Sequence, residues 1–488
     1  MKNLRDFLAL LETRGELARV REPVSRDLEI TEIVDRTVKA GGPALLFENV
    51  TDCTIPLAIN LFGTESRMAA ALGVAALDDL GARVEALLAS APAGDWRSRL
   101  RALPRLAELN RALPRTVSRA PCQEVVLRGD EADLGILPAQ LCWPADGGRY
   151  LTATQVVTRS PETGARNTGM YRVQIFDART CAMHWQMHKG GAAHLREAEA
   201  RGEELPVAVA LGGHPALAYA ASAPLPEGLD EALLAGYLAG RPVELVKGAT
   251  VDLLVPAEAE IVVEGVVRPG ERRREGPFGD HTGYYSLADD YPVMHVTAVT
   301  HRRDPIYPSI VVGPPPMEDA PMGKATERLF LPLIRLQLPE VLDIHLPVEG
   351  GFHNIALVRI RKGYPGHARK VMQAIWGLGQ LMFSKVVVVV DEDVDVQDLR
   401  ETVWRVAANI DPGRDLVFAE GIADVLEHAS DRLGLGGKLG IDATRKWPEE
   451  GFPREWPEVL AMDPDVKARV DAIWDRLGIT LPGRGNAP

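Results

Sequence analysis

The chain has 488 residues, 46% apolar and 25% charged, which is typical of a soluble protein with two or three domains. Its formal net charge of −13 argues against a nucleic-acid-binding protein, which needs a clustered basic face. Four scattered cysteines without a CxxC pair favour a reduced, cytoplasmic protein over a disulfide scaffold or zinc site. The amphipathic N-terminus matches neither a signal nor a transit peptide, and the longest apolar run is strand-sized, which leaves only peripheral membrane contact open.

Residues 1–118 are predicted to form an α/β region that ends in a helical linker. LRDFLALLETRG and ITEIVDRTVKAGG have helical periodicity, whereas ELARVREPV and PALLFENV are typical of strands. The arginine-rich run from Trp96 to Arg115 has leucines at helical spacing. We interpret this run as a solvated amphipathic helix rather than a nucleic-acid patch.

Residues 119–318 read mostly as short strands separated by turn residues, with one helix predicted over 228–240. Many consecutive strands predict a barrel or a sandwich. Residues 319–455 alternate strands with helices and include KVVVVVD at 385–391, which predicts a partly parallel α/β domain. Residues 456–488 carry a last amphipathic helix, suited to packing on a partner subunit or domain.

Two glycine-containing segments resemble nucleotide-binding loops but lack their context. LGLGGKLGID (433–442) follows the polar HASDR rather than a strand, so a dinucleotide fingerprint is disfavoured. PMGKATE (321–327) has alanine where a phosphate loop needs Ser or Thr. Both segments are predicted to be plain loops.

The stretch EGPFGDHTGYYS (275–286) places Glu275, Asp280 and His281 among glycines and a proline. Such a backbone is neither helix nor strand, and a folded loop can aim both carboxylates into one cavity. Two close carboxylates cannot both ionise easily, so one pKa should rise and allow that group to act as a general acid. The alternative is two exposed carboxylates on a turn.

A second candidate site lies upstream, in residues 167–191. Arg172 is a permanent cation whose planar fork can grip a carboxylate or phosphate. Asn167 and His188, joined by Glu231 from the predicted helix, make a mixed nitrogen and oxygen set for a divalent ion such as Mn²⁺. The alternative is an ordinary hairpin arginine and a surface histidine.

Together these residues resemble the UbiD family of prenylated-FMN-dependent decarboxylases. The resemblance rests on NTGMYR, HKGG, DEALLAG, EGPFGDHTGYY and FSKVVVVVDEDVD in this order, and extends to ATRKWPEEGFPREWP near the C-terminus. It implies an α+β fold in which a central split β-barrel of the flavin-reductase type is flanked by an N-terminal α/β region and a C-terminal α/β domain. It also implies a homo-oligomer.

The activity implied is reversible loss of CO₂ from an aromatic or α,β-unsaturated acid, with prenylated FMN from a UbiX-type prenyltransferase as the electron sink. By resemblance, Arg172, Glu275 and Asp280 form the catalytic triad, with Asp280 as proton donor and His281 in a supporting position. Some family members have glutamate at the position of Asp280. With aspartate there, this chain resembles the branch that acts on hydroxybenzoates with bulky ring substituents. We therefore expect a hydroxyaryl acid, with a polyprenylated ring among the options.

The resemblance also implies a flavin phosphate held through Mn²⁺, with K⁺ nearby in many members. The matching metal ligands are Asn167, His188 and Glu231. The positions matched to cofactor contacts are these three together with Met170, Tyr171, Arg172, His184, Trp185, Gln186, Lys189, Gly190 and Lys385. Met187 stands where some relatives have glutamine, so polar contacts are in doubt there.

Two other classes of function stay open from the sequence. One is a split-barrel oxidoreductase that uses plain FMN with a nicotinamide, for which no credible dinucleotide fingerprint is found. The other is a non-catalytic flavin-binding subunit, which we expect to have lost one of Arg172, Glu275 or Asp280.

Overall fold

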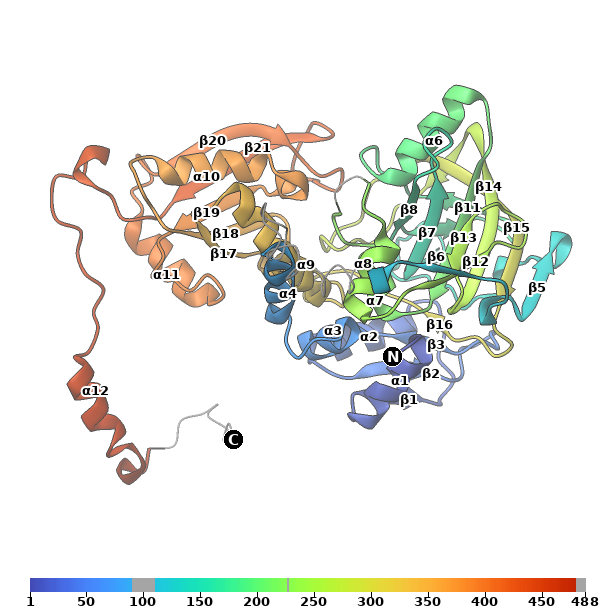
Figure 1. Ribbon diagram of the computed structural model, residues 1–488, viewed down its shortest axis with the longest axis horizontal. Coiled ribbons are helices and arrows are strands. Elements are labelled where there is room, and N and C mark those ends of the chain that lie inside the picture. Colours follow the sequence, from blue (N-terminus) through green and yellow to red (C-terminus); the bar gives the residue numbers. More distant parts are fainter. Residues whose placement is uncertain (90–109, 226–227, 480–488) are drawn as a thin grey trace, which may run out of the picture. The chain divides into compact units, whose positions relative to one another are not determined.

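A computed structural model describes residues 1–89, 110–225 and 228–479 (Figure 1). The chain separates into two compact units, one of Met1–Gly363 with His367–Thr444 and the other of Tyr364–Gly366 with Arg445–Pro488. The first unit contains all four sheets. Most of the arginine-rich run, residues 96–109, lies outside the described residues, so its helix stays a prediction.

The N-terminal region builds a four-stranded sheet in the order β1-β2-β3-β16. Its elements are α1 (Leu4–Thr13), β1 (Leu17–Val20), α2 (Glu29–Lys39), β2 (Ala44–Phe47), β3 (Leu57–Ile59), α3 (Glu65–Leu72) and α4 (Asp78–Leu88). The fourth strand, β16 (Tyr307–Pro308), comes from much later in the chain and pairs parallel to β3. The predicted α/β region is therefore tied to the middle of the sequence by backbone hydrogen bonds.

The middle of the chain forms a nine-stranded antiparallel sheet in the order β6-β9-β10-β15-β14-β11-β7-β8, with β5 also paired to β15. Its strands are β5 (Val125–Arg128), β6 (Tyr150–Leu151), β7 (Thr154–Arg159), β8 (Arg166–Gly169), β9 (Val173–Ile175), β10 (Thr180–Met183), β11 (Leu205–Gly212), β14 (Ala259–Glu275) and β15 (Asp289–His301). The same part of the chain forms a smaller sheet of β4 (Arg115–Val117), β12 (Glu244–Lys247) and β13 (Leu254–Pro256). In the sequence, β4 precedes the strands of the large sheet, and β12 and β13 lie between β11 and β14. Strand-rich structure is confirmed here.

Strands β14 and β15 are the longest of this sheet, and they position the loop between them. Their register shifts next to Gly265, where a Cβ would lie 2.2 Å from the backbone oxygen of His295. Only glycine fits this close approach of two strands. Beyond the shift the ladder continues to the pair of Glu275 with Asp289, so the last residue of β14 is fixed by pairing.

The mixed α+β class is confirmed, whereas the barrel stays a prediction. Within the described residues, β6 and β8 each pair with one neighbouring strand, so the pairing traces an open sheet. The expectation of a single helix in this region is wrong, because the chain forms α6 (Gly190–Arg201), α7 (Pro215–Ala220) and α8 (Glu231–Ala239). The sequence of α6, GGAAHLREAEAR, has good helix formers but few apolar residues, so the hydrophobic period is weak.

The C-terminal part of the first unit is a five-stranded sheet in the order β17-β18-β19-β21-β20. Its elements are α9 (Ala320–Gln337), β17 (Val341–His345), β18 (Ile355–Ile360), α10 (His367–Trp376), β19 (Val386–Val390), α11 (Leu399–Asn409), β20 (Leu416–Ile422) and β21 (Leu435–Asp442). The three central strands are parallel, and the outer two are antiparallel. This is the partly parallel α/β pattern that the sequence predicts.

Both segments predicted to be plain loops are regular structure instead. PMGKATE lies within α9, whose Pro321 stands in the first turn, where proline is tolerated. LGLGGKLGID contains the whole of β21, which pairs with β19 on one side and β20 on the other. A Cβ on Gly440 would lie 2.5 Å from the sulfur of Met372, so this glycine allows α10 to approach the sheet closely.

The second unit contains α12 (Pro464–Asp471), flanked by the short 3₁₀ turns η6 (Pro448–Glu450) and η7 (Trp474–Leu477). Several of its apolar side chains are exposed, among them Leu460, Met462 and Ile473. The packing of the last helix on a partner subunit or domain stays a prediction.

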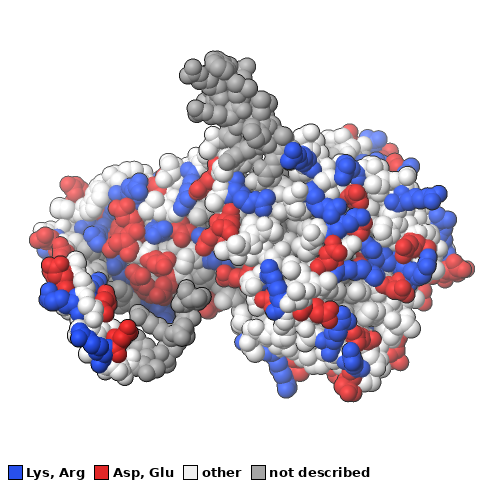
Figure 2. All heavy atoms as spheres, turned by 60° about the horizontal axis from the view of Figure 1, so that its bottom comes forward, with Lys and Arg blue, Asp and Glu red and all other residues white. Residues whose placement is uncertain are grey.

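No helix among the described residues is long and apolar enough to cross a membrane. On the face shown in Figure 2, Lys and Arg side chains are interspersed with Asp and Glu side chains. The four cysteines are all free thiols, and burial raises the pKa of Cys122 and of Cys181 to about 12. Such thiols are unreactive at neutral pH.

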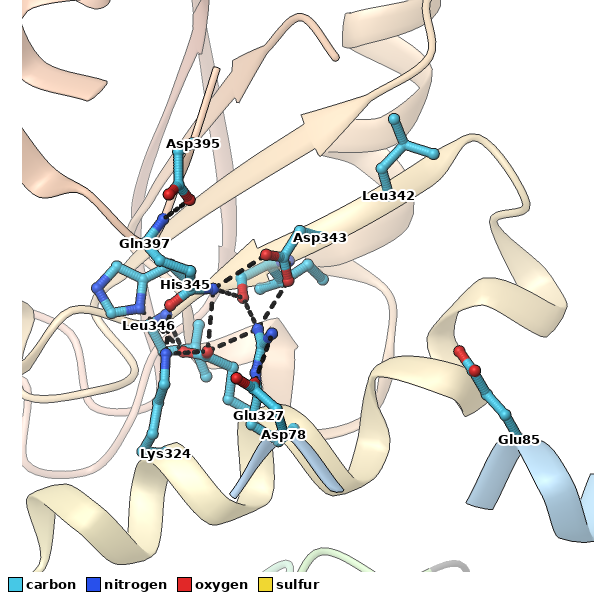
Figure 3. Close-up of polar contacts among 12 residues, drawn as sticks. Asp78, Glu85, Lys324, Glu327, Leu342, Asp343, His345, Leu346, Asp395 and Gln397 are labelled. Atoms are coloured by element: carbon cyan, nitrogen blue, oxygen red, sulfur yellow. Dashed lines mark hydrogen bonds and ion pairs between the residues drawn. The ribbon is translucent and has the colours of Figure 1, made fainter. Parts of the chain in front are cut away.

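A buried carboxylate, Glu327 of α9, ties this helix to β17 (Figure 3). It accepts hydrogen bonds from the Lys324 ammonium at 2.7 Å and the Leu346 backbone N–H at 2.6 Å, contacts His345 Nδ1 at 3.1 Å, and pairs with Arg328 at 2.7 Å. Burial alone would raise the pKa of Glu327, but these neighbours lower it to about 2. The ionised form is therefore favoured by folding.

Replacing this carboxylate should destabilise the protein in a pH-dependent way. Because the folded pKa lies below the ordinary glutamate pKa of 4.5, the charge stabilises the fold above pH 4.5, and this stability is lost as the pH falls towards 2. We expect Glu327→Gln to lower the free energy of unfolding in urea by on the order of 3 kcal/mol at pH 7. Glu420→Gln, at an exposed ion pair, should have no measurable effect. If Glu327→Gln lowered the free energy of unfolding equally at pH 7 and at pH 3, the lowered pKa of Glu327 would be contradicted.

Candidate active site

The loop between β14 and β15 has a fixed shape. It leaves the strand at Gly276, whose φ of +90° strongly favours glycine. The Gly279 N–H donates to Asp146 Oδ1 at 2.7 Å, and a Cβ on Gly279 would lie 2.2 Å from the Trp143 ring. The loop is therefore packed against the residues before β6 and presents its side chains in one arrangement.

Arg172, in the turn between β8 and β9, lies between the two carboxylates of this segment. Its Nε and Nη2 donate to Glu275 at 2.8 and 3.1 Å, and its Nη1 donates to Asp280 at 2.5 Å. Nη2 also donates to the Ser286 hydroxyl at 3.0 Å. All three charged groups are buried or nearly so, with side-chain exposures of 6% for Arg172, 0% for Glu275 and 13% for Asp280. Residues far apart in the sequence thus form one buried ionic cluster.

The expectation that one of the two carboxyl pKa values is raised is wrong for this state of the protein. Burial alone would raise the pKa of Glu275, but hydrogen bonds with His184 and Arg172 lower it to about 2. Burial likewise opposes ionisation of Asp280, yet the neighbouring His281 and Arg172 hold its pKa well below the usual range. Reasoning from two carboxylates alone omitted the cation between them.

His281 makes the contact that the sequence did not reveal. Its Nδ1 lies 2.9 Å from Asp280 Oδ1, and its backbone N–H donates to the same oxygen at 2.8 Å. The ring packs against Phe352 and His353, with centroid distances of 5.3 and 5.1 Å. Ser286, which accepts a hydrogen bond from Arg172, is a residue that the sequence analysis missed, although it closes the same motif. The sequence signal for this contact was that His281 directly follows a candidate acid on a folded loop.

Glu231, the first residue of α8, contacts the backbone directly after Asn167. Glu231 Oε2 accepts the backbone N–H of Thr168 at 3.0 Å, next to Asn167 on β8. Burial raises the pKa of Glu231 to about 7, and Arg166, whose charge acts in the opposite direction, is itself paired with Asp230 at 2.5 Å. Asn167 Nδ2 is buried and has no hydrogen-bond partner among the described residues. A carboxylate and an amide oxygen are ligand types that suit a divalent cation.

His188, the third predicted metal ligand, is placed differently. Its ring packs on Phe383 with a centroid distance of 5.1 Å. Among the described residues, it makes no hydrogen bond to Asn167 or Glu231, and no group of three His, Cys, Asp or Glu residues is arranged to hold a metal. Glu231 contacts the backbone next to Asn167, and the joint role of these three residues as metal ligands stays a prediction.

Comparison with known proteins identifies the family. Three family models of 3-octaprenyl-4-hydroxybenzoate carboxy-lyase match: its N-terminal domain over residues 8–86, its Rift-related domain over 115–315 and its C-terminal domain over 320–443. The chain belongs to the UbiD family. An uncharacterized protein of Aquifex aeolicus is 52% identical to it over 481 residues, which cover 98% of this chain and 99% of that protein.

Solved UbiD-class structures are similar over almost the whole chain. HmfF from Pelotomaculum thermopropionicum, in complex with FMN, is 33% identical with a TM-score of 0.79 and covers 96% of this chain and 98% of that chain. An evolved dimeric form of HmfF in complex with prFMN is 32% identical with a TM-score of 0.76, over 95% and 98% of the two chains. Vanillic acid decarboxylase of Sedimentibacter hydroxybenzoicus, in closed form, is 28% identical with a TM-score of 0.85, over 98% and 99%.

In this UbiD-family chain, several residues that the sequence matches to cofactor contacts surround the beginning of α6. A Cβ on Gly190 would lie 2.2 Å from Asn167 Oδ1, and one on Gly191 would lie 2.6 Å from Trp185 Nε1. The indole N–H of Trp185 is buried without a partner among the described residues, like the Asn167 amide. Two unpaired donors beside a glycine cradle fit an anionic group such as a phosphate.

The other matched residues take several positions. Tyr171 stands edge-on to Trp185 at a centroid distance of 6.5 Å, and the Met170 N–H donates to the Ala221 backbone oxygen at 2.8 Å. The backbone oxygen of Gln186 accepts the Lys189 N–H at 3.0 Å, and burial lowers the pKa of Lys189. The bond between Gln186 and Lys189 closes the turn that precedes α6, and the roles of these residues stay predictions.

Two expected cofactor residues have other partners. His184, expected along the cofactor, has its Nδ1 3.0 Å from Glu275 Oε2, and burial lowers its pKa. Lys385 forms a 2.5 Å ion pair with Glu427 in the C-terminal part of the unit. Met187 is 74% exposed, so the side chain at this position does not line a buried site.

The raised pKa of Glu231 predicts a stabilising substitution in the metal-free protein. Between pH 4.5 and about 7 the folded protein binds more protons than the unfolded chain, so stability falls as the pH rises. We expect Glu231→Gln, which keeps the acceptor for Thr168, to raise the free energy of unfolding by about 2 kcal/mol at pH 8 and hardly at pH 4.5. Glu65→Gln, at the exposed first residue of α3, is the matched control. Destabilisation at pH 8 would count against a raised pKa.

Proposed function

We propose that this chain is a prenylated-FMN-dependent carboxy-lyase that reversibly and non-oxidatively decarboxylates an aromatic carboxylic acid. The observation that carries the proposal is the buried cluster in which Arg172 joins Glu275 to Asp280. Membership of the UbiD family and likeness to a vanillic acid decarboxylase support it. The reaction replaces CO₂ by a proton, so that RCO₂⁻ and H⁺ give RH and CO₂.

The three residues take different parts in this reaction. Prenylated FMN supplies the electron sink that no side chain can provide. Asp280, which keeps 13% of its side chain exposed, delivers the proton to the carbon that has lost CO₂. Glu275 is fully buried and stays ionised, and it holds Arg172 through two parallel hydrogen bonds.

Arg172 has little capacity left for the substrate. A guanidinium has five N–H donors, and four of them are engaged, with Glu275, Asp280 and Ser286. One Nη1–H remains to orient the substrate carboxylate while the Asp280 contact is kept. A bidentate grip on the substrate requires Asp280 to release Arg172, which frees that acid for proton transfer.

The substrate class follows from the residue at position 280 and from the relatives. Asp280 is one methylene shorter than glutamate, which leaves room for a substituted ring. Vanillic acid decarboxylase, a structural relative, is named for a hydroxyaryl acid. We propose a hydroxyaryl acid, with a polyprenylated ring as one option and carboxylation as the reverse direction when CO₂ is abundant.

Asn167, His188 and Glu231 are proposed to hold Mn²⁺ at the flavin phosphate, with K⁺ nearby. The buried carboxylate and the unpaired Asn167 amide support this site. His188 reaches it only if its ring leaves Phe383. Met170, Tyr171, Trp185, Gln186, Lys189, Gly190 and Lys385 are proposed cofactor contacts, and a UbiX-type prenyltransferase is the proposed supplier of the cofactor.

The wider context of the proposal comes from the sequence. We propose that the protein is a homo-oligomer in the cytoplasm and that it contacts the membrane surface if its substrate is polyprenylated. It also comprises a split barrel over residues 119–318, between an α/β region at 1–118 and an α/β domain at 319–455, with a tail from 456. The two competing functions are less well supported, because LGLGGKLGID is a strand rather than a nucleotide turn and the ionic cluster is intact.

Decarboxylation by the protein co-expressed with a UbiX-type prenyltransferase tests the proposal. Absorption and mass spectrometry should show prenylated FMN, and a panel of aryl acids should include one that releases CO₂. Asp280→Asn should keep the cofactor and lower exchange of the product's ring proton with D₂O by at least about 10²-fold. Asp289→Asn, at the exposed carboxylate paired with Glu275 in the ladder, should exchange normally. Normal exchange by Asp280→Asn would overturn its role.

Metal content provides an independent test of the phosphate end. We expect Asn167→Ala and Glu231→Gln each to lose most of the Mn²⁺ and flavin that wild type retains, because each removes an oxygen or charge from the ion. Elemental analysis and flavin absorbance of the purified proteins measure this. Asn409→Ala on α11, whose amide donates to the Ala443 backbone at 3.2 Å, is the control and should bind normally. Full occupancy in both variants would place the metal elsewhere.

A further inference from the structure

The proton that Asp280 delivers must first reach Asp280. In the described protein this carboxylate is ionised, with its pKa held well below the usual range. Each of its oxygens is engaged by donors: Oδ2 by Arg172, and Oδ1 by the backbone and the ring of His281. An ionised carboxylate accepts hydrogen bonds but has no proton to give. A neighbouring group therefore has to supply it.

Only one of these donors can give up a proton near neutral pH. Arginine is not deprotonated in proteins, and a backbone N–H is not acidic. The His281 imidazole titrates close to neutrality, and its Nδ1 lies 2.9 Å from Asp280 Oδ1, within the range of direct proton transfer. The side chain keeps 21% of its surface exposed, so that its outer edge can exchange protons with water.

The charges around His281 favour the imidazolium. Asp280 contacts the ring directly, and the negative charges of Asp319, at the start of α9, and Asp424, after β20, act in the same direction. His353, which packs against the ring from the segment after η4 (Val348–Gly350), is the opposing group. Burial lowers the pKa of His281, but these carboxylates outweigh it and raise the pKa above 6.5.

Charge balance in the occupied site leads to the same residue. Arg172, Glu275 and Asp280 carry one positive and two negative charges, a sum of −1. A substrate carboxylate makes this −2 in a buried site, which is unfavourable unless a cation compensates. A protonated His281 returns the sum to −1. When CO₂ leaves and the proton is delivered, the substrate carboxylate becomes neutral products and the imidazolium becomes a neutral imidazole. Both added charges therefore disappear in the same reaction.

We propose that His281, as an imidazolium, positions Asp280 and supplies the proton that Asp280 delivers to the product carbon. The inference rests on the proposed function. Nδ1 of His281 gives its proton to Oδ1 of Asp280, which leaves a neutral imidazole and a neutral carboxylic acid. The acid gives the proton to the carbon that has lost CO₂ and becomes a carboxylate again. The imidazole then takes up one proton from water, so that one proton is consumed per CO₂ released.

A titration by NMR tests the shared proton without any substrate. Protein labelled with ¹³C at histidine Cε1 gives one ring signal per histidine, and the signal missing from His281→Asn identifies His281. We expect its pKa to lie above 6.5 in wild type and to fall by more than one unit in Asp280→Asn, since the carboxylate that favours the imidazolium is gone. A wild-type pKa below 6.5, or one that Asp280→Asn does not change, would overturn the proposal.

Kinetics separate proton supply from mere support of the loop. His281→Asn keeps an N–H donor where Nδ1 stands but cannot titrate. We expect it to bind prenylated FMN normally and to release CO₂ on the order of 10²-fold more slowly than wild type, and to lose the fall of kcat/KM at alkaline pH. The control is His353→Asn, because Nδ1 of His353 contacts the Gly351 backbone oxygen rather than Asp280. This variant should keep the fall of kcat/KM at alkaline pH.

The outcomes distinguish this inference from the proposed function. If wild type releases no CO₂ from any acid, the proposed function fails, and the NMR titration still decides whether His281 shares a proton with Asp280. If wild type is active and His281→Asn matches it in rate and pH profile, only the inference fails. If His281→Ala loses activity and His281→Asn is fully active, His281 has a purely structural role.

Discussion

A guanidinium buried between two carboxylates is the interaction on which the rest of this site depends. Glu275 and Asp280 could not both remain ionised at their depth without Arg172, because burial alone raises the pKa of each. The large sheet supplies the precision that this pairing needs. Strand pairing fixes Glu275 at the end of β14, and Arg172 is held in the short turn between β8 and β9. The cluster is thus a structural as well as a chemical unit.

The two carboxylates differ although one cation serves both. Glu275 is fully buried and has both oxygens engaged by Arg172 and His184, which makes it a fixed charge. Asp280 accepts one bond from Arg172 and keeps some exposure, and its other oxygen faces an imidazole. Proton transfer needs a group that can change its charge at small cost, and this condition selects Asp280 with His281 rather than Glu275 with Arg172.

The sequence predicted those features that depend on local pattern or on a recognisable motif. The α+β class and the partly parallel C-terminal sheet follow from apolar runs such as the one that forms β19. Helix α6 was missed because its apolar period is weak, and β21 because glycines usually disfavour strands. The pKa of Asp280 could not be inferred from spacing, because the decisive cation is a residue about a hundred positions away. Lys385 shows the limit of carrying positions over, since here it pairs with Glu427.

The two ends of the proposed site solve the problem of buried charge in opposite ways. At the ionic cluster, both buried carboxylates pair with Arg172, so they are ionised before substrate arrives. At the start of α8, Arg166 is paired with Asp230, and Glu231 is left with a pKa of about 7. A carboxylate in that state binds either a proton or an external cation, and the two compete. Affinity for a divalent ion at this end should therefore rise with pH through 7, while Glu275 and Asp280 of the resting protein stay ionised throughout the same range.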